Sequence, residues 1–171
     1  TDKIWEQILE QGLRSIDPDL NAQSTGQEQK LVVWDDLQKQ KSPDFVMAIE
    51  HQRWVIDAKY KLKQTIESGD QYQIFAYSHL ARANKRPMDA AALIFPGSEE
   101  RVRKHSRHPD QDLQLHLMFL PFPQRKDLAH WNQYIKVLST EFSKRIGIES
   151  LHRQADANKP NAGRMGQSAA Q

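Results

Sequence analysis

An acid and a lysine stand two positions apart in an otherwise apolar stretch, at Asp57 and Lys59 of the segment WVIDAKYK. Side chains alternate between the two faces of a strand, so Asp57 and Lys59 share one face. The opposite face is apolar enough to be core and carries Trp54, Ile56, Ala58 and Tyr60. Burying an unpaired carboxylate in such a strand would cost free energy. A salt bridge between Asp57 and Lys59, or an edge strand with one solvated face, would explain both residues without any chemistry.

A second acid, Asp44, follows Pro43 at the start of the preceding predicted strand. Pro-Asp is common at turns, so a turn aspartate is its ordinary interpretation. If residues 42–63 form a hairpin, however, its two strands bring Asp44 and Asp57 side by side. Two carboxylates at the end of a sheet form a hard oxygen site that suits magnesium or manganese. Lys59 would add a positive charge that could hold a water or neutralise a phosphate, which is the equipment of phosphodiester hydrolysis.

Two predicted helices carry further polar candidates. Gln73 and Tyr77 are four residues apart and share a face, on which Asp70 also lies. An amphipathic border is the ordinary interpretation of this pair. The core stripe of the same helix is predicted to consist of Tyr72, Phe75, Ala76 and Leu80. In the first helix, Glu6 is compatible either with a carboxylate turned toward the sheet end, where it would help to hold a metal, or with a surface glutamate.

Hydrophobic periodicity predicts the elements that would position these residues. Helices are expected over 2–16 with Asp2 as N-cap, over 70–83 and over 125–146, the last with Leu128, Trp131, Ile135, Leu138 and Phe142 on its apolar side. Strands are expected over 31–37, in the hairpin 42–63 with His51-Gln52 as its turn, over 90–95 and over 113–121. Residues 20–29 and 98–111 read as polar loops. This order predicts an α/β fold with a mixed sheet flanked by helices.

Length and composition bound the organisation of the chain. The 171 residues suit one domain, predicted over 1–150, with a disordered polar C-terminal tail over 151–171. The absence of cysteine excludes disulfides, zinc-thiolate sites and cysteine nucleophiles, and fits a cytoplasmic location. No apolar run reaches the roughly 20 residues of a membrane span, and no signal peptide is visible. The chain also lacks an initiator Met, as a fragment of a longer protein would.

The candidate residues together carry a family resemblance. Pro43-Asp44 followed by Asp57-Ala58-Lys59 resembles the PD-(D/E)XK nuclease signature, and the run from Gln73 to Tyr77 resembles the QxxxY motif of its RecB-like branch. The segments VIDAKYK and DQYQIFAYSH are similar to the C-terminal nuclease domain of McrC-like (McrBC-type) restriction proteins. Glu6 in KIWEQIL matches the position of the helical acid in the first motif. The resemblance covers residues 2–120 in element order and is specific over 43–79.

This resemblance implies a restriction-endonuclease-like αβββαβ core and the activity of a Mg²⁺-dependent endodeoxyribonuclease, in which Mn²⁺ can substitute. Asp44 and Asp57 would be metal ligands, with the carbonyl of Ala58 as a third, and Lys59 would position or activate the water. Gln73 would orient the site or touch the DNA backbone, and Tyr77 would support it. The middle acid is Asp rather than the commoner Glu, as in some McrC-like members. The resemblance further implies a restriction or phage-defence role and an AAA+ NTPase partner.

DNA contact is expected from basic residues, since phosphate contacts give affinity without sequence information. The candidates are Arg82, Lys85, Arg86, Arg101, Arg103, Lys104 and Arg107. His105, His108 and His116 are interpreted as surface histidines. Cutting both strands usually needs two active sites, so a dimer or larger assembly is expected. Two other functions stay open: a catalytically silent nuclease-fold module that binds DNA or serves assembly, and a repair or transposition nuclease with the same core.

Overall fold

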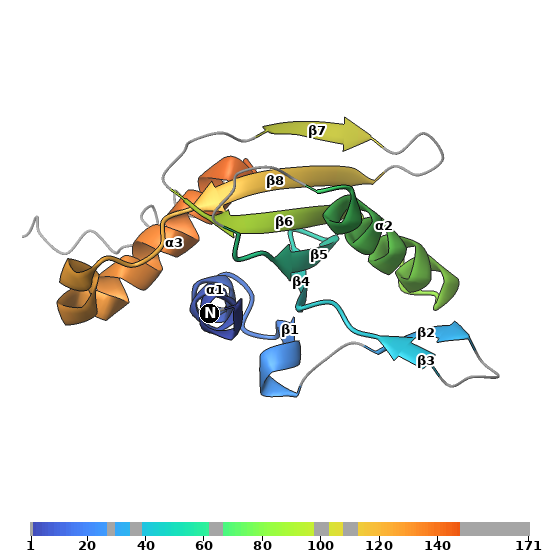
Figure 1. The fold of residues 1–171 in the computed structure, drawn as a ribbon, viewed down its shortest axis with the longest axis horizontal. Coiled ribbons are helices and arrows are strands. Elements are labelled where there is room, and N and C mark those ends of the chain that lie inside the picture. Colours follow the sequence, from blue (N-terminus) through green and yellow to red (C-terminus); the bar gives the residue numbers. More distant parts are fainter. Residues whose placement is uncertain are drawn as a thin grey trace, which may run out of the picture.

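A computed structural model describes residues 2–26, 30–34, 39–61, 67–97, 103–107 and 113–147. The helices are α1 (Asp2–Arg14), α2 (Ser68–Ala83) and α3 (Trp131–Arg145), with 3-10 turns η1 (Gln23–Thr25) and η2 (Arg125–His130). The strands are β1 (Asn21–Ala22), β2 (Leu31–Trp34), β3 (Lys39–Lys41), β4 (Phe45–Ile49), β5 (Gln52–Ala58), β6 (Ala90–Pro96), β7 (Arg103–Arg107) and β8 (Gln114–Leu120). Figure 1 shows the helices arranged around one main sheet. The predicted disordered tail, 151–171, lies outside the described residues.

The main sheet has six strands in the order β1-β4-β5-β6-β8-β7. Strand β4 is antiparallel to β1 and β5, whereas β5, β6 and β8 run parallel, and β7 is antiparallel to β8. The elements α1, β1, β4, β5, α2 and β6 therefore follow the order αβββαβ. The mixed α/β sheet flanked by helices is confirmed, and it is consistent with a restriction-endonuclease-like fold.

The first strand of this core is not the predicted one. Residues 31–34 form β2, which pairs with β3 in a separate two-stranded sheet. The first core strand is instead β1. It is only two residues long and lies within the segment 20–29, which was expected to be a polar loop. A two-residue strand is too short to show the alternation by which strands are found in a sequence. A further strand, β7, lies within the segment 98–111, which was also expected to be a loop.

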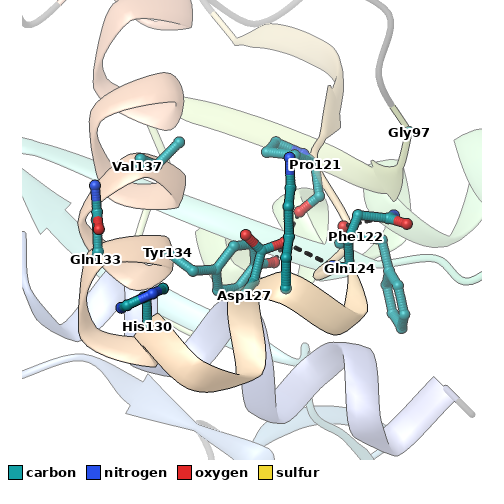
Figure 2. A pocket seen from close by; sticks show the side chains of 10 residues that line it. Gly97, Pro121, Phe122, Gln124, Asp127, His130, Gln133, Tyr134 and Val137 are labelled. Carbon is teal, nitrogen blue, oxygen red and sulfur yellow. Dashed lines mark hydrogen bonds between the residues drawn. The ribbon is translucent and has the colours of Figure 1, made fainter.

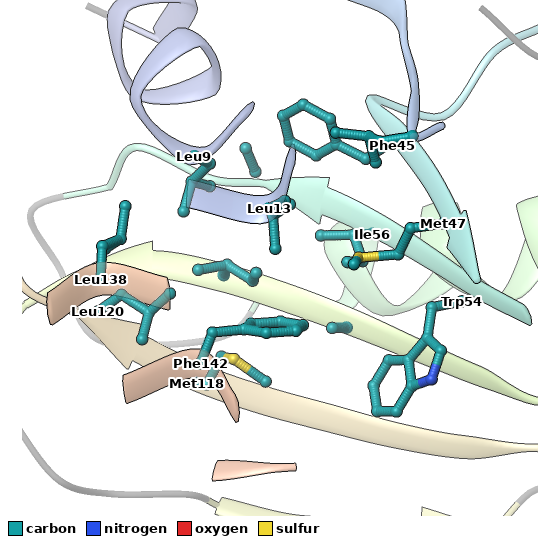
Figure 3. Close-up of a cluster of buried hydrophobic side chains, with 14 of the residues drawn as sticks. Leu9, Leu13, Phe45, Met47, Trp54, Ile56, Met118, Leu120, Leu138 and Phe142 are labelled. Atoms are coloured by element: carbon teal, nitrogen blue, oxygen red, sulfur yellow. The ribbon is translucent and has the colours of Figure 1, made fainter. Parts of the chain in front are cut away.

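Two apolar layers hold the sheet between the helices. On one face, side chains of α1 and α3 pack on alternate residues of β4, β5, β6 and β8 (Figure 3). On the other face, α2 packs on the intervening residues. The predicted apolar face of β5 is confirmed, because Trp54, Ile56 and Ala58 are buried in the first layer, with Tyr60 half-buried against it. Val55 and Asp57 are buried on the opposite face of the sheet. Because β5 also lies between β4 and β6, it is a central strand, and the edge-strand interpretation is wrong.

Helix α2 is rotated relative to the predicted core stripe. Ile74, Tyr77 and Ala81 face the sheet, whereas Tyr72 is 73% exposed and Phe75 is 37% exposed. Aromatic and small apolar residues occur all around this helix, so periodicity alone did not single out the buried face. The rotation turns the side of Tyr77, and with it Gln73, toward the sheet.

The β4–β5 turn lies one residue earlier than predicted, at Glu50 and His51. Their φ angles are 47° and 70°, so both residues occupy the left-handed region that a two-residue type I′ hairpin turn requires. The turn therefore forms without glycine.

The C-terminal helix begins as the 3-10 turn η2, and Leu128 in it is 66% exposed rather than part of the core. His116 is not a surface histidine: it is 3% exposed on β8, and its ring centroid lies 4.7 Å from that of Trp54. The side chains of His105 and His108 lie outside the described residues. Every helix within the described ranges is too short or too polar to serve as a membrane span.

Candidate active site

The β4–β5 hairpin brings two acids together at its open end. The antiparallel register of the two strands runs from Ile49 opposite Gln52, beside the turn, to Phe45 opposite Ile56. Continuing that register by one residue places Asp44 opposite Asp57. Residues directly opposite each other in an antiparallel pair point to the same face and lie close together. The two carboxylates therefore meet on the face of the sheet that α2 covers.

The backbone hydrogen-bond ladder between β4 and β5 stops at this point because of a proline. Phe45 and Ile56 form a hydrogen-bonded pair, since they lie an even number of residues from the two-residue turn. The next hydrogen-bonded pair would be Pro43 with Ala58. Proline has no N–H to donate to the Ala58 carbonyl, and the Ala58 N–H donates instead to Asp44 Oδ2 over 2.8 Å. Pro43 thus leaves the Ala58 carbonyl without a ladder donor beside the two acids.

Lys59 joins this hairpin end to α2. Its Nζ lies 2.5 Å from Asp57 Oδ2 and donates to Gln73 Oε1 over 2.7 Å. Gln73 Nε2 in turn donates to the hydroxyl of Tyr77 over 2.9 Å. The structure therefore brings Asp44, Asp57, Lys59, Gln73 and Tyr77 into one continuous set of contacts. Gln73 is held by Tyr77 with its amide oxygen directed at the ammonium group.

Four more charged residues line the same cleft, which has a volume of about 280 Å³: Asp2, Glu6, Lys61 and Asp70. Glu6 reaches it from α1, on the other side of the sheet end. Asp70 is buried, accepts from Lys61 Nζ over 2.7 Å and lies 3.8 Å from Lys59 Nζ. The interpretation of the sequence left Asp70 and Lys61 out of the site. Their spacing was a signal, because Asp70 precedes Gln73 by three residues on one helix face and Lys61 follows Lys59 by two.

Burial and mutual repulsion raise the pKa values of the acids. Burial, followed by the charge of Asp57, raises the pKa of Asp44 to about 8, although the Ala58 N–H opposes the shift. Burial also raises the pKa of Asp57, against the lowering effect of Lys59, and burial and Asp57 raise that of Glu6. Burial alone would lower the pKa of Lys59, but Asp57 and Asp70 raise it, so the lysine stays protonated. The cleft therefore favours added positive charge near the three acids.

The donor set fits a hard divalent cation. Two carboxylates and the carbonyl of Ala58 converge, and Asp57 Oδ2 is buried with no hydrogen-bond partner other than the ammonium with which it forms an ion pair. Among the described residues, no three His, Cys, Asp or Glu side chains stand arranged as metal ligands. Mg²⁺ tolerates this, because it is commonly held by one or two carboxylates and keeps several waters.

The predicted DNA-binding residues do not join this cluster. Arg82 lies in the last turn of α2, and Lys85 and Arg86 follow the helix. This segment leads to the start of β5, where the Asp89 N–H donates to the Arg53 carbonyl over 2.8 Å. They are therefore at the opposite edge of the sheet from the carboxylates. Arg82 follows Gln73 by nine residues, or about 13 Å along the helix axis. Arg103 and Lys104 belong to β7, and their side chains lie outside the described residues, as does Arg101.

One comparison with known proteins gives a match. The family model described as "McrBC 5-methylcytosine restriction system component" matches residues 1–96, which is more than half of the chain. The matched segment contains every residue of the cleft. No curated protein matches the chain.

Proposed function

The chain belongs to the family of McrBC 5-methylcytosine restriction system components, and from this membership we propose that it is the DNA-cleaving component of such a system. Its activity would be that of a Mg²⁺-dependent endodeoxyribonuclease of the PD-(D/E)XK type. The observation that carries the proposal is the opposition of Asp44 and Asp57 at an open hairpin end, with Lys59 held beside them by Gln73.

Asp44, Asp57 and the Ala58 carbonyl would hold the metal, with Glu6 near enough to assist. When bound, Mg²⁺ would neutralise charge on the scissile phosphate and acidify the attacking water. The protonated ammonium of Lys59 donates hydrogen bonds and cannot accept a proton. It is therefore suited to hold the water oxygen and to stabilise negative charge as the new phosphorus–oxygen bond forms and the old one breaks. Asp70 places a second negative charge near the Lys59 ammonium, and the ion pair of Asp70 with Lys61 holds that carboxylate in place.

DNA is the proposed substrate, and an AAA+ NTPase subunit is the proposed partner. A restriction component that cuts on its own would endanger its host, so control by a second, nucleotide-driven subunit fits the family. Cleavage of both strands would need two copies of the cleft, hence a dimer or larger assembly.

The direct test is cleavage of plasmid DNA by the full chain, with Mg²⁺ or Mn²⁺, alone and with the partner subunit. Metal binding is measured separately by calorimetry, so that a requirement for the partner does not hide the site. Nicked or linear product that depends on the metal would support the proposal. DNA binding without metal binding and without cleavage under any condition would instead favour the catalytically silent module.

Gln73→Ala is expected to lower the cleavage rate about 10- to 100-fold while leaving the fold intact, the loss typical of removing a residue that orients a reacting group. The substitution frees Lys59 Nζ from its 2.7 Å contact and leaves Tyr77 without its partner. Gln71→Ala, an exposed change two residues away on α2, serves as the matched control. Equal rates for the two variants, with equal unfolding temperatures, would contradict the positioning role.

A further inference from the structure

A second hollow lies on the same edge of the sheet as the cleft. Strands β5, β6 and β8 are parallel, so their carboxyl ends share that edge. Beyond β6 and β8, a cavity of about 690 Å³ is bounded by Gly97, Pro121, η2 and the first turns of α3 (Figure 2). We call it the η2 cavity. Of the residues predicted from the sequence to contact DNA, the three whose side chains the structure describes, Arg82, Lys85 and Arg86, do not line it.

One aromatic pair separates the two hollows. Tyr60 lines the cleft, and Phe122 lines the η2 cavity. Their ring centroids are 5.7 Å apart in an edge-to-face arrangement, and Phe122 also packs on Trp5 at 5.8 Å. The strand ends that carry the two hollows, β5 and β8, are two strand spacings apart, or about 10 Å. A nucleotide chain advances about 3.4 Å per residue along a duplex, so roughly three nucleotides bridge this distance.

The η2 cavity has the side chains that a nucleic-acid strand needs. Arg125 and Lys126 are exposed, and Lys126 lines the cavity. One acid, Asp127, also lines the cavity, and its Oδ2 is held by the Gln124 N–H over 2.7 Å. Aromatic rings and amides complete the walls: Phe122, Tyr134, Gln124 and Gln133. Exposed cations are the side chains that contact the phosphate backbone of a duplex.

We propose that the substrate strand passes from the cleft across Phe122 to the η2 cavity, where Lys126 contacts its phosphates. Arg125, which lines an adjoining hollow that also contains Phe122 and Gln124, makes a second phosphate contact. This inference rests on the proposed function for the identity of the substrate as DNA. It also assigns the main phosphate contacts to the carboxyl edge of the sheet, rather than to Arg82, Lys85 and Arg86 at the opposite edge. The surplus of acids in the cleft makes such a contact useful, because the cleft alone repels a polyanion.

The test compares two charge-neutralising double variants of the full chain, both made in an Asp57→Asn background to prevent cleavage. Binding of a fluorescein-labelled DNA duplex is followed by anisotropy over a range of salt concentrations. Arg125→Gln/Lys126→Gln is expected to weaken binding about tenfold, and to reduce the slope of log affinity against log salt by about two. Lys85→Gln/Arg86→Gln removes the same charge at the other edge and is expected to leave both values close to those of the background protein.

Equal losses in the two double variants would show a net-charge effect and overturn the strand path, as would unchanged binding in the Arg125/Lys126 variant. Unfolding temperatures of both variants exclude loss of fold. Plasmid cleavage by the chain with native Asp57 is measured independently. If the unmodified chain cleaves DNA but the Arg125/Lys126 variant binds DNA normally, only the strand path is overturned. If that variant loses DNA binding but the unmodified chain does not cleave under any condition, only the nuclease proposal is overturned.

Discussion

Asp57→Asn is expected to reduce metal-dependent DNA cleavage by about 10³-fold or more, the largest loss of any single change in the cleft. Asn has the size of Asp but lacks its negative charge and one of its two acceptor oxygens. The substitution therefore removes a proposed metal ligand and the counter-charge that lies 2.5 Å from Lys59 Nζ. Plasmid cleavage in Mg²⁺, with product quantified over time, measures the loss.

Asp19→Asn is the matched control, because Asp19 is exposed and follows the C-terminal end of α1, whereas the N-terminal end of that helix reaches the cleft with Glu6. Its cleavage rate should equal that of the unmodified chain. A second readout is calorimetric titration with Mg²⁺, in which only the Asp57 variant should lose binding. Cleavage at the original rate by Asp57→Asn would remove Asp57 from the catalytic site and with it the assignment of the whole cluster.

Asp44→Asn is expected to stabilise the metal-free protein at pH 8 and above. The pKa of Asp44 is raised to about 8 in the folded state, mainly by burial. Between its ordinary value and about 8, the folded protein holds a proton that the unfolded chain has released, so the free energy of unfolding falls as pH rises. Asn cannot ionise and can still accept from the Ala58 N–H. We expect a gain of about 1–3 kcal/mol, or several degrees in unfolding temperature.

The gain should be absent near pH 4, where the native carboxyl is protonated in the folded protein. Saturating Mg²⁺ should also reduce this stability gain at pH 8, because the metal would stabilise the unmodified protein and not the Asp44→Asn variant. Thermal unfolding followed by circular dichroism at both pH values, with and without Mg²⁺, measures these differences. A difference in unfolding temperature that is the same at pH 4 and pH 8 would contradict the link to the ionisation of Asp44.

The local geometry of the hairpin could be predicted from the sequence, because a period of two fixes which side chains share a face. That rule placed Trp54, Ile56 and Ala58 in the core. The pairing of Asp44 with Asp57 also depends on the turn, which lies one residue earlier than the sequence predicted. Gln73 and Tyr77 were found through their spacing and through the family resemblance. Their contact with Lys59 follows from packing, since it depends on how α2 is rotated against the sheet.

What the sequence did not predict depends on contacts between distant segments. The rotation of α2 exposes Tyr72, and only the shape of the sheet beneath it decides that outcome. The basic residues at the end of α2 stay a prediction as DNA contacts, since a charge cluster in a sequence carries no information about which edge of a sheet it reaches. Arg125 and Lys126 belong to no motif, and only the topology places Lys126 in the lining of the η2 cavity.

Pro43 leaves one further consequence at the hairpin end. Because it prevents the ladder from closing, the Ala58 amide proton is bonded to a titrating carboxylate rather than to a backbone carbonyl. The chemical shift of that proton should follow the ionisation of Asp44, and should move again when a cation displaces the contact. A single amide resonance, in protein labelled with ¹⁵N and otherwise unmodified, would thus act as a built-in reporter of both proton and metal occupancy. It would let each be followed without substrate.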